Sequence, residues 1–444
     1  MEKNDQLTVL IEGYNSEGAG VAKPDGYVLF IPGTIVGEEV VAHITRANKN
    51  YGYAKAIEIL KPSKDRKTPE CSKATACGGC QLWHMSYDCQ LRFKKQKVCD
   101  NMRKAGIDCP VDDTLPSPSQ MAYRNKAQYP IRNQNGQITG GFYRQNSHTV
   151  IECKCVIQPP VFNEILNYVI SLMTEFGVTA YDEISAKGLL RHLYLRANSD
   201  RSEIMLCLVL NGKNTLKKEF FDKLLVKFPA ISTICINYNT EKTNVVLGKR
   251  YEVVYGKGYI TDTLLGKKFE ISPESFYQVN HDGCEVLYSV VKDYVKDATN
   301  LLDLYCGIGT IGICTMGEKA KLTGIEIVAK AIENAKRNAL LNGIENADFA
   351  AMDASASADF AKGDYDTIIV DPPRKGCDVK TLEYLEQKAP KTLVYVSCDS
   401  ATLARDLAIL KQKGFEVKKI TPVDMFPQTN HVECVALLRS DINL

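Results

Sequence analysis

Apolar runs and helical periodicity alternate regularly over the last third of the chain. Strands are predicted at 300–305, 321–327, 365–370 and 392–396. The continuous apolar run of 393–396 indicates a strand that is buried on both faces. An amphipathic helix is predicted at 328–342, between the second and third strands. Strands that alternate with helices predict a doubly wound α/β sheet.

The first sixty residues follow another pattern, in which apolar and polar positions alternate and glycines mark the turns. Strands are predicted at 7–12, 27–31, 38–45 and 53–60. Short strands at this spacing are typical of a small five-stranded barrel of the oligonucleotide-binding kind. Its second half interleaves basic and aromatic side chains, which suits single-stranded RNA and an ordinary solvated edge about equally. These side chains are Arg46, Lys49, Tyr51, Tyr53 and Lys55.

The middle of the chain has a mixed α+β pattern. Strands are predicted at 127–132, 140–144 and 189–196, and helices at 161–175 and 215–227. A chain of 444 residues is expected to hold two to three domains. The changes of pattern predict three domains, with the bounds 1–62, 63–270 and 271–444.

Composition and charge limit the class of protein. Apolar residues make up 45% of the chain and charged residues 24%, as is ordinary for globular proteins. No apolar run reaches the roughly 18 residues of a membrane-spanning helix, and the polar N-terminus lacks the apolar core of a signal peptide. We therefore expect a cytoplasmic protein without a membrane partner. A net charge of +2 leaves any nucleic-acid surface to local patches.

Sixteen cysteines in a cytoplasmic chain point to metal binding or catalysis more than to disulfides. Cys71, Cys77 and Cys80 follow a polar linker with the spacing C-x5-C-x2-C, which is a strong metal signal. Zinc and an iron–sulfur cluster both fit three clustered thiols, and both need a fourth ligand. Spacing alone does not choose among the candidates for it, which are Cys89, Cys99, Cys109, Cys153 and Cys155.

The helical stretch that contains Cys89 and Cys99 is strongly basic. Its cations indicate a solvated or RNA-facing surface. They are Arg92, Lys94, Lys95, Lys97, Arg103 and Lys104.

Side chains that carry chemistry stand at the ends of the predicted C-terminal strands, where ligands bind in open α/β sheets. The first strand contains Asp303 and runs into a G-x-G-x-x-G pattern that ends at Gly312. That pattern suits a dinucleotide and an adenosyl cofactor equally. The second strand ends near Glu326, where an acid can bind a ribose.

The remaining strands separate these two possibilities. Asp371-Pro372-Pro373-Arg374 forms a rigid loop with few backbone donors, which can wall a pocket for a flat base. Base-modifying methyltransferases need such a pocket, and dehydrogenases have no evident use for it. Cys398 ends the neighbouring strand. If the final strand runs antiparallel, its early residue Glu433 lies at the same edge. We therefore expect one crevice to contain Asp303, Glu326, Asp371, Cys398 and Glu433.

These residues resemble those of the RNA uracil-5-methyltransferase family, and most of all its bacterial 23S ribosomal RNA branch. The resemblance covers nearly the whole chain. One departure is Asp399-Ser400, where the family usually has Asn-Pro, and we expect it to change only the stiffness of the loop. The matching motifs are Ile271 to Asn280, Asp303 to Thr310, Asp371 to Lys375, Ser397-Cys398-Asp399 with Thr402 and Arg405-Asp406-Leu407, and His431-Val432-Glu433.

The resemblance implies a three-part fold. A TRAM-like barrel precedes a central α+β domain with an RNA-binding surface, and a Rossmann-like class I methyltransferase domain follows. The resemblance also implies a [4Fe–4S] cluster. Its fourth cysteine in the family precedes a short apolar-Gln stretch, so the match favours Cys155 over Cys153. The implied ligands are Cys71, Cys77, Cys80 and Cys155.

The implied reaction forms 5-methyluridine in 23S ribosomal RNA, on a single-stranded or looped uridine that is flipped out. Cys398 is the nucleophile that adds to carbon 6 of uracil, which makes carbon 5 nucleophilic. Glu433 is the general base that removes the carbon-5 proton after methyl transfer. A monomer without an obligate protein partner is expected. The residues implied for S-adenosylmethionine are Gln278, Tyr305, Glu326, Asp353 and Asp371.

Three alternatives stay open. A transfer RNA uracil-5-methyltransferase would use the same chemistry, but we expect that branch to lack the barrel and the cysteine cluster. A non-catalytic iron–sulfur protein that binds RNA would have no use for Cys398 and Glu433. A dinucleotide oxidoreductase is the third.

Overall fold

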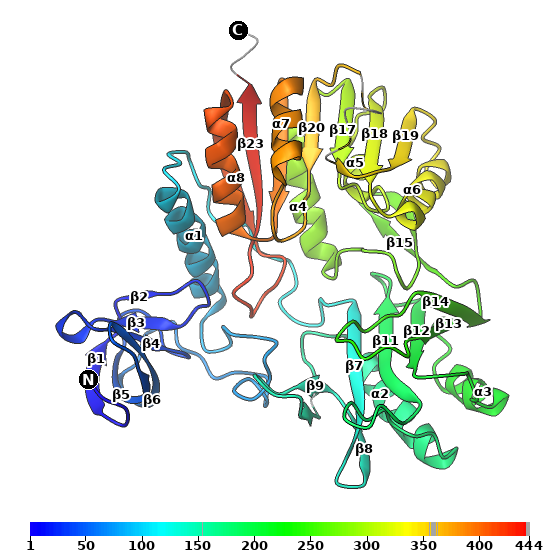
Figure 1. Cartoon of the computed structure of the whole chain (residues 1–444), viewed down its shortest axis with the longest axis horizontal. Coiled ribbons are helices and arrows are strands. Elements are labelled where there is room, and N and C mark those ends of the chain that lie inside the picture. Colours follow the sequence, from blue (N-terminus) through cyan, green and yellow to red (C-terminus); the bar gives the residue numbers. More distant parts are fainter. Residues whose placement is uncertain (153, 355, 357–360, 362, 441–444) are drawn as a thin grey trace.

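The N-terminal region of the computed structural model is a six-stranded sheet (Figure 1). The structure describes residues 1–152, 154–354, 356, 361 and 363–440. The sheet order is β1-β5-β6-β4-β3-β2, around a core of side chains such as Leu29, Val40 and Ile44. The strands are β1 (Gln6–Leu10), β2 (Gly13–Tyr14), β3 (Gly20–Ala22), β4 (Val28–Ile31), β5 (Glu39–Ala47) and β6 (Tyr51–Lys61), with the 3-10 turn η1 (Pro24–Gly26).

All four strands predicted in this region are present, with ends within two residues of the predicted bounds. The prediction missed β2 and β3, which are too short for alternation to be visible in the sequence.

Helix α1 (Tyr87–Lys104) lies between the barrel and the C-terminal domain (Figure 1). Arg92, Arg103 and Lys104 are exposed, as predicted for this basic stretch. The prediction is wrong for Lys94, which is fully buried with its Nζ 2.5 Å from a carboxylate oxygen of Asp424. The reason is that the chain after β22 (Phe415–Val423) covers this side of the helix.

The central region is a six-stranded mixed sheet in the order β14-β13-β12-β11-β7-β8. Two helices and the sheet share a core that includes Phe162, Leu193 and Phe220. Both helices begin within three residues of the predicted starts. The elements are β7 (Lys126–Gln134), β8 (Gln137–Gly140), α2 (Pro160–Glu175), β11 (Leu190–Ala197), β12 (Ile204–Leu210), α3 (Lys218–Lys227), β13 (Ile231–Tyr238) and β14 (Arg250–Tyr255).

A short hairpin projects from this sheet toward the cysteine-bearing segment. It consists of β9 (Phe142–Tyr143) and β10 (Val150–Ile151). The amide of Gln145, in its turn, donates to the carbonyl of Ala76 at 3.0 Å. The hairpin thus connects the segment around Cys77 with the chain that leads to Cys155.

The C-terminal region is a seven-stranded sheet in the order β19-β18-β17-β20-β21-β23-β22. The first five of these strands are parallel, and β23 inserts antiparallel beside β21. The doubly wound class and the antiparallel last strand are as predicted. The elements are α4 (His281–Tyr294), β17 (Asn300–Leu304), α5 (Thr310–Thr315), β18 (Lys321–Glu326), α6 (Ala329–Leu341), β19 (Ala347–Ala351), β20 (Thr367–Val370), α7 (Val379–Lys388), β21 (Thr392–Ser397), α8 (Ser400–Gln412), β22 and β23 (Glu433–Ser440).

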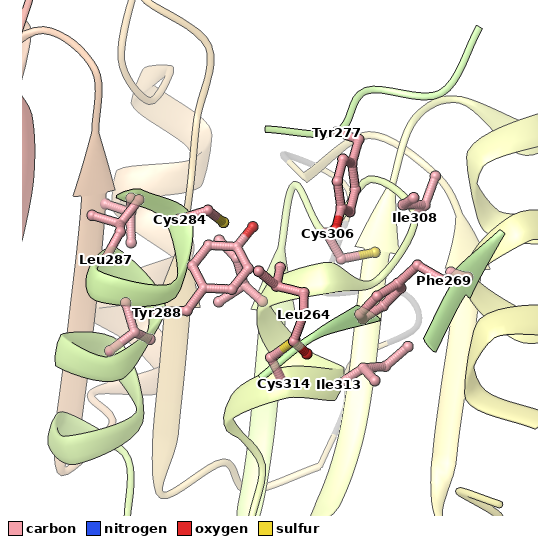
Figure 2. Close-up of a cluster of buried hydrophobic side chains, with 14 of the residues drawn as sticks. Leu264, Phe269, Tyr277, Cys284, Leu287, Tyr288, Cys306, Ile308, Ile313 and Cys314 are labelled. Carbon is pink, nitrogen blue, oxygen red and sulfur yellow. The ribbon is translucent and has the colours of Figure 1, made fainter. Parts of the chain in front are cut away.

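A hairpin of β15 (Ile260–Leu264) and β16 (Lys267–Ile271) packs on this sheet. Figure 2 shows Leu264 and Phe269 of the hairpin beside side chains of α4 and α5. Cys284, Cys306 and Cys314 are buried in the same core, and burial raises the pKa of each thiol. These three cysteines therefore pack as small apolar side chains. Within the described ranges no helix combines the length and the apolar character needed to cross a bilayer.

Candidate active site

One cavity of about 960 Å³ opens where the parallel strands end and β23 begins. Its position follows from the topology, because antiparallel β23 starts at the edge where its neighbours stop. All seven residues that were implied for catalysis and for the methyl donor line this cavity. They are Gln278, Tyr305, Glu326, Asp353, Asp371, Cys398 and Glu433.

Asp303, which was predicted to join them, is not part of the cavity lining. Its side chain is fully buried, and Oδ2 accepts a hydrogen bond from the amide of Gly312 at 3.0 Å. Burial, together with the nearby Asp371 and Glu326, raises the pKa of this carboxyl to about 8. Asp303 therefore holds the start of α5 against the sheet. The prediction failed because successive side chains of a strand point to opposite faces.

The turn between β17 and α5 has an unusual backbone. Tyr305 has a φ of +65°, a left-handed conformation that is costly for a non-glycine residue and is concentrated at functional sites. Gly307 and Gly309 follow with φ of +55° and +82°. The amide of Gly307 donates to Oε2 of Glu326 at 3.3 Å. The glycine turn and the predicted ribose-binding acid are thus in direct contact.

Cys398 and Glu433 are neighbours because Ser397 pairs with Cys434 in antiparallel register. Burial, together with the carboxyls of Glu433 and Asp371, raises the pKa of the Cys398 thiol to about 11. Burial also raises the pKa of Glu433 to about 8, with a further contribution from Asp371. Burial alone raises the pKa of Asp371 to about 7. Two carboxyls that titrate near neutrality therefore flank a thiol, a combination that is concentrated in catalytic sites.

Arg374 is the cation that opposes the raised pKa values of Cys398 and Glu433. It was not predicted as an individual site residue. Its guanidinium lies near both groups, hydrogen bonds the thiol of Cys398 and lowers the pKa of that thiol and of Glu433. Its carbonyl accepts a hydrogen bond from Thr402 Oγ1 at 3.1 Å, which ties the loop to α8. The signal for this residue was its position directly after the Pro-Pro pair.

The same cavity continues to the predicted metal-binding thiols. Burial, together with neighbouring thiols, raises the pKa of Cys80 to about 12 and of Cys155 to about 11. Cys89, Cys99 and Cys109 do not line the cavity. The thiols that do line it are Cys71, Cys77, Cys80 and Cys155.

No group of three His, Cys, Asp or Glu side chains with the arrangement of a metal site is found among the residues that the structure describes. Cys153 lies outside those residues. The iron–sulfur cluster therefore stays a prediction that rests on the convergence of four thiols from two segments of the chain.

Comparisons with known proteins agree with this geometry. A family described as tRNA (Uracil-5-)-methyltransferase matches residues 86–441, and the TRAM domain matches residues 2–57. A protein of Oceanobacillus iheyensis named as an uncharacterized RNA methyltransferase is 43% identical over 99% of this chain and 97% of its own length. A Clostridium tetani protein with the same description is 42% identical over 99% of this chain and 97% of its own.

A solved structure matches nearly the whole fold. The tRNA (uracil-54, C5)-methyltransferase of Pyrococcus abyssi, in complex with S-adenosyl-L-homocysteine, aligns with a TM-score of 0.79 and 28% identity. The alignment covers 97% of this chain and 99% of the Pyrococcus chain. The unaligned 3% of this chain is much shorter than the N-terminal barrel, so the alignment includes most of the barrel. The expectation that transfer RNA enzymes lack the barrel is therefore wrong for this relative. With these matches over almost its full length, the chain belongs to the uracil-5-methyltransferase family of S-adenosylmethionine-dependent RNA methyltransferases and carries an N-terminal TRAM domain.

Proposed function

We propose that this enzyme forms 5-methyluridine in 23S ribosomal RNA through a covalent bond between Cys398 and carbon 6 of the target uracil. One observation carries the proposal: Cys398 and Glu433 lie on neighbouring antiparallel strands and line one cavity. The preference for 23S ribosomal RNA rests on the motifs that the chain shares with that branch.

The first step is the addition of the Cys398 thiolate to carbon 6. The electron pair of the carbon 5–carbon 6 double bond moves toward oxygen 4, and carbon 5 becomes a nucleophile. The raised pKa of Cys398 means that the resting residue is a thiol. Arg374 is the group in contact with Cys398 that favours the thiolate, so this cation supports the attack.

The last step removes the proton that carbon 5 still carries after methylation. Glu433 accepts this proton, the bond between carbon 6 and sulfur breaks, and the thiolate is regenerated. A carboxylate with a pKa of about 8 is a stronger base than an ordinary glutamate, which suits proton removal from carbon. S-adenosylhomocysteine, one proton and the modified RNA leave per turnover.

The methyl donor occupies the part of the cavity between β17 and β18. S-adenosylmethionine supplies the methyl group that carbon 5 receives. Glu326 binds the ribose hydroxyls beside the glycine turn, as acids at the end of the second strand do in such sheets. The other proposed donor-binding residues are Gln278, Tyr305, Asp353 and Asp371.

We also assign a [4Fe–4S] cluster to the four thiols. Cysteine thiolates are the usual ligands of such clusters, and these four line the same cavity. Each ligand of a four-iron cluster binds a different iron atom, whereas all ligands of zinc bind one ion. Four thiols that do not converge on one point therefore fit a cluster better than a zinc site. The proposed ligands are Cys71, Cys77, Cys80 and Cys155.

RNA approaches over the barrel and the cationic rim of the cavity. Phe30, Tyr51 and Tyr53 form a cluster on β4 and β6 with ring centroids 5.7 to 6.1 Å apart. Both tyrosines are 41% exposed, so their rings are available for stacking on bases. Arg124 and Lys126 line the cavity and are suited to binding phosphates beside the flipped uridine.

Transfer RNA is the second candidate substrate, and the Pyrococcus relative is the observation that favours it. The decisive experiment offers labelled S-adenosylmethionine with unmodified 23S ribosomal RNA and, separately, with unmodified transfer RNA. Label in 5-methyluridine of 23S ribosomal RNA, absent with Cys398→Ala, supports the proposal. Label in transfer RNA alone assigns the other substrate. No label in either RNA favours a non-catalytic iron–sulfur protein that binds RNA.

Three organisational predictions stay proposals as well. They are a cytoplasmic location, a monomeric state and the domain bounds 1–62, 63–270 and 271–444. Light scattering of the purified protein, cell fractionation and limited proteolysis are the measurements that test them.

A further inference from the structure

The segment 424–432, which joins β22 to β23, is held to the cysteine-bearing segment at Gln428. This residue is fully buried and has a φ of +70°, a strained backbone conformation for a residue other than glycine. Its carbonyl accepts hydrogen bonds from the amides of Gln81 and Leu82, both at 3.0 Å. These two residues directly follow Cys80.

The side chain of Gln428 makes a second connection, to α1. Nε2 of Gln90 donates to Oε1 of Gln428 at 2.9 Å, and the amide of Gln428 donates to Oε1 of Gln90 at 2.9 Å. Gln90 also donates to the carbonyl of Leu82 at 3.3 Å. The two glutamines therefore join segment 424–432, helix α1 and the chain after Cys80 in one buried network.

Two further hydrogen bonds cross the same boundary. The hydroxyl of Tyr123 donates to the carbonyl of Pro427 at 3.0 Å, and the amide of Asn430 donates to Oε1 of Gln81 at 3.4 Å. Tyr123 packs in one apolar cluster with Trp83 and Cys80. The thiol-bearing segment is therefore hydrogen bonded to segment 424–432 at several points, and a displacement of one is expected to displace the other.

Segment 424–432 is also a wall of the active-site cavity. Phe426, Thr429 and His431 line the cavity, and Glu433 follows directly as the first residue of β23. Cys398 has a separate support, because it stands between β21 and α8, whose N-terminus is capped by Asp399. A shift of this wall therefore changes the position of the base more than that of the nucleophile.

We propose that Gln428 is a positioning residue: its buried side-chain bond to Gln90, which also contacts Leu82, couples the segment after Cys80 to the catalytic base Glu433. This inference rests on the proposed function. It predicts a specific kinetic effect: methyl transfer proceeds, but the carbon-5 proton passes slowly to Glu433 and the bond between carbon 6 and Cys398 breaks slowly. The intermediate that accumulates is the covalent enzyme–RNA adduct with its methyl group already attached.

The first test compares Gln428→Gly with Gln96→Ala. Glycine accepts a positive φ, so Gln428→Gly keeps the backbone bonds to Gln81 and Leu82 and removes only the side-chain link. Gln96 is an exposed glutamine of the same helix as Gln90, and its side chain donates a hydrogen bond to Asp100. The measurement is single-turnover methyl transfer and the release of labelled RNA from the adduct on denaturing gels. We expect release to slow by about tenfold or more in Gln428→Gly, with methyl transfer and the control unchanged.

The second test asks whether the thiols act through Gln428. Cys80→Ser and Gln428→Gly are combined in a double-mutant cycle with the release rate as the readout. We expect the double variant to release RNA no more slowly than the slower single variant. The chain has one tryptophan, Trp83, beside Cys80, so its emission reports the thiol segment independently of activity.

The outcomes separate this inference from the proposed function. Wild type that transfers no methyl group to any RNA overturns the proposed function. Methyl transfer by wild type with unchanged release in Gln428→Gly, or multiplicative slowing in the double variant, overturns the positioning role. If the variants do not fold, removal of iron from wild type should raise amide hydrogen exchange in 424–432, and unchanged exchange there overturns the inference.

Discussion

Cys398 and Glu433 lie side by side because the residue before the first pairs with the residue after the second on antiparallel strands. The thiol and the carboxyl therefore reach the same cavity from two neighbouring strands of the C-terminal sheet. This register separates the two chemical steps: one strand carries the group that bonds to the base, and the next carries the group that frees it.

Glu433→Gln should trap the reaction after methyl transfer. The amide has nearly the same shape but does not accept the carbon-5 proton, so release should fall by about 10² to 10⁴-fold. The measurement is the amount of labelled methyl group that migrates with the protein on a denaturing gel. Glu416→Gln, an exposed glutamate of β22, is the matched control and should leave no adduct. If both variants release RNA at the wild-type rate, Glu433 is not the base.

The activity of the wild-type enzyme should rise with pH between about 7 and 9. Glu433 has a pKa raised to about 8, and it must be ionised to accept a proton. Cys398, with a pKa of about 11, also gains thiolate over this range. Both effects have the same sign, so activity is lost as the pH falls through 8. Single-turnover release from the wild-type adduct, measured against pH, should show the inflection of Glu433 alone, and a flat profile would contradict this assignment.

Arg374→Met should weaken the nucleophile. The guanidinium lowers the pKa of Cys398 against burial, so its removal raises that pKa, and one pKa unit corresponds to about tenfold less thiolate at neutral pH. Alkylation of Cys398, followed by mass spectrometry of its peptide, should shift to higher pH. Arg374→Lys keeps the charge and should recover part of the loss. An unchanged alkylation profile in Arg374→Met would mean that the cation does not act on the thiol.

The edge of the sheet was predictable because one topological rule governs it. Parallel strands end where a final antiparallel strand begins, and apolar runs that stop at Asp371 and Cys398 show those ends in the sequence. Asp303 was misplaced because it lies inside such a run, and its neighbours Leu302 and Leu304 do not reveal which face it points to. The position of a polar residue in the sequence predicts where a strand ends better than it predicts the face of the sheet to which one side chain points.

Contacts between segments that are distant in the sequence could not be predicted from the pattern of apolar and polar residues. Lys94 lies in a basic helix that looks solvated, and its partner Asp424 is separated from it by most of the chain. The network of Gln90 and Gln428 has the same character. A buried polar pair leaves no periodic trace, because each member looks like an ordinary surface residue in its own segment.

The Lys94–Asp424 pair gives a stability prediction. Both side chains are 0% exposed, so removal of one partner leaves a buried charge without compensation. Lys94→Ala should lower the free energy of unfolding by about 3 to 5 kcal/mol. Lys95→Ala, at the next position but in a solvent-exposed pair with Asp113, should cost far less. Urea unfolding of both variants is the measurement, and equal losses would show that burial of the pair does not matter.

Cys155 and Cys153 offer a test of the cluster in which the variants differ by two positions. Cys155 lines the cavity with the thiols of the C-x5-C-x2-C segment, and burial raises its pKa, so metal binding is what makes a thiolate favourable there. Cys155→Ser should therefore lose iron and the visible absorption of a cluster when the protein is purified without oxygen. Cys153→Ser should retain four irons per chain, the number that a [4Fe–4S] cluster contains. Loss of iron in Cys153→Ser alone would exchange the roles of the two cysteines. If the anaerobically purified wild type contains zinc and no iron, the four thiols form a zinc site and the cluster proposal is wrong.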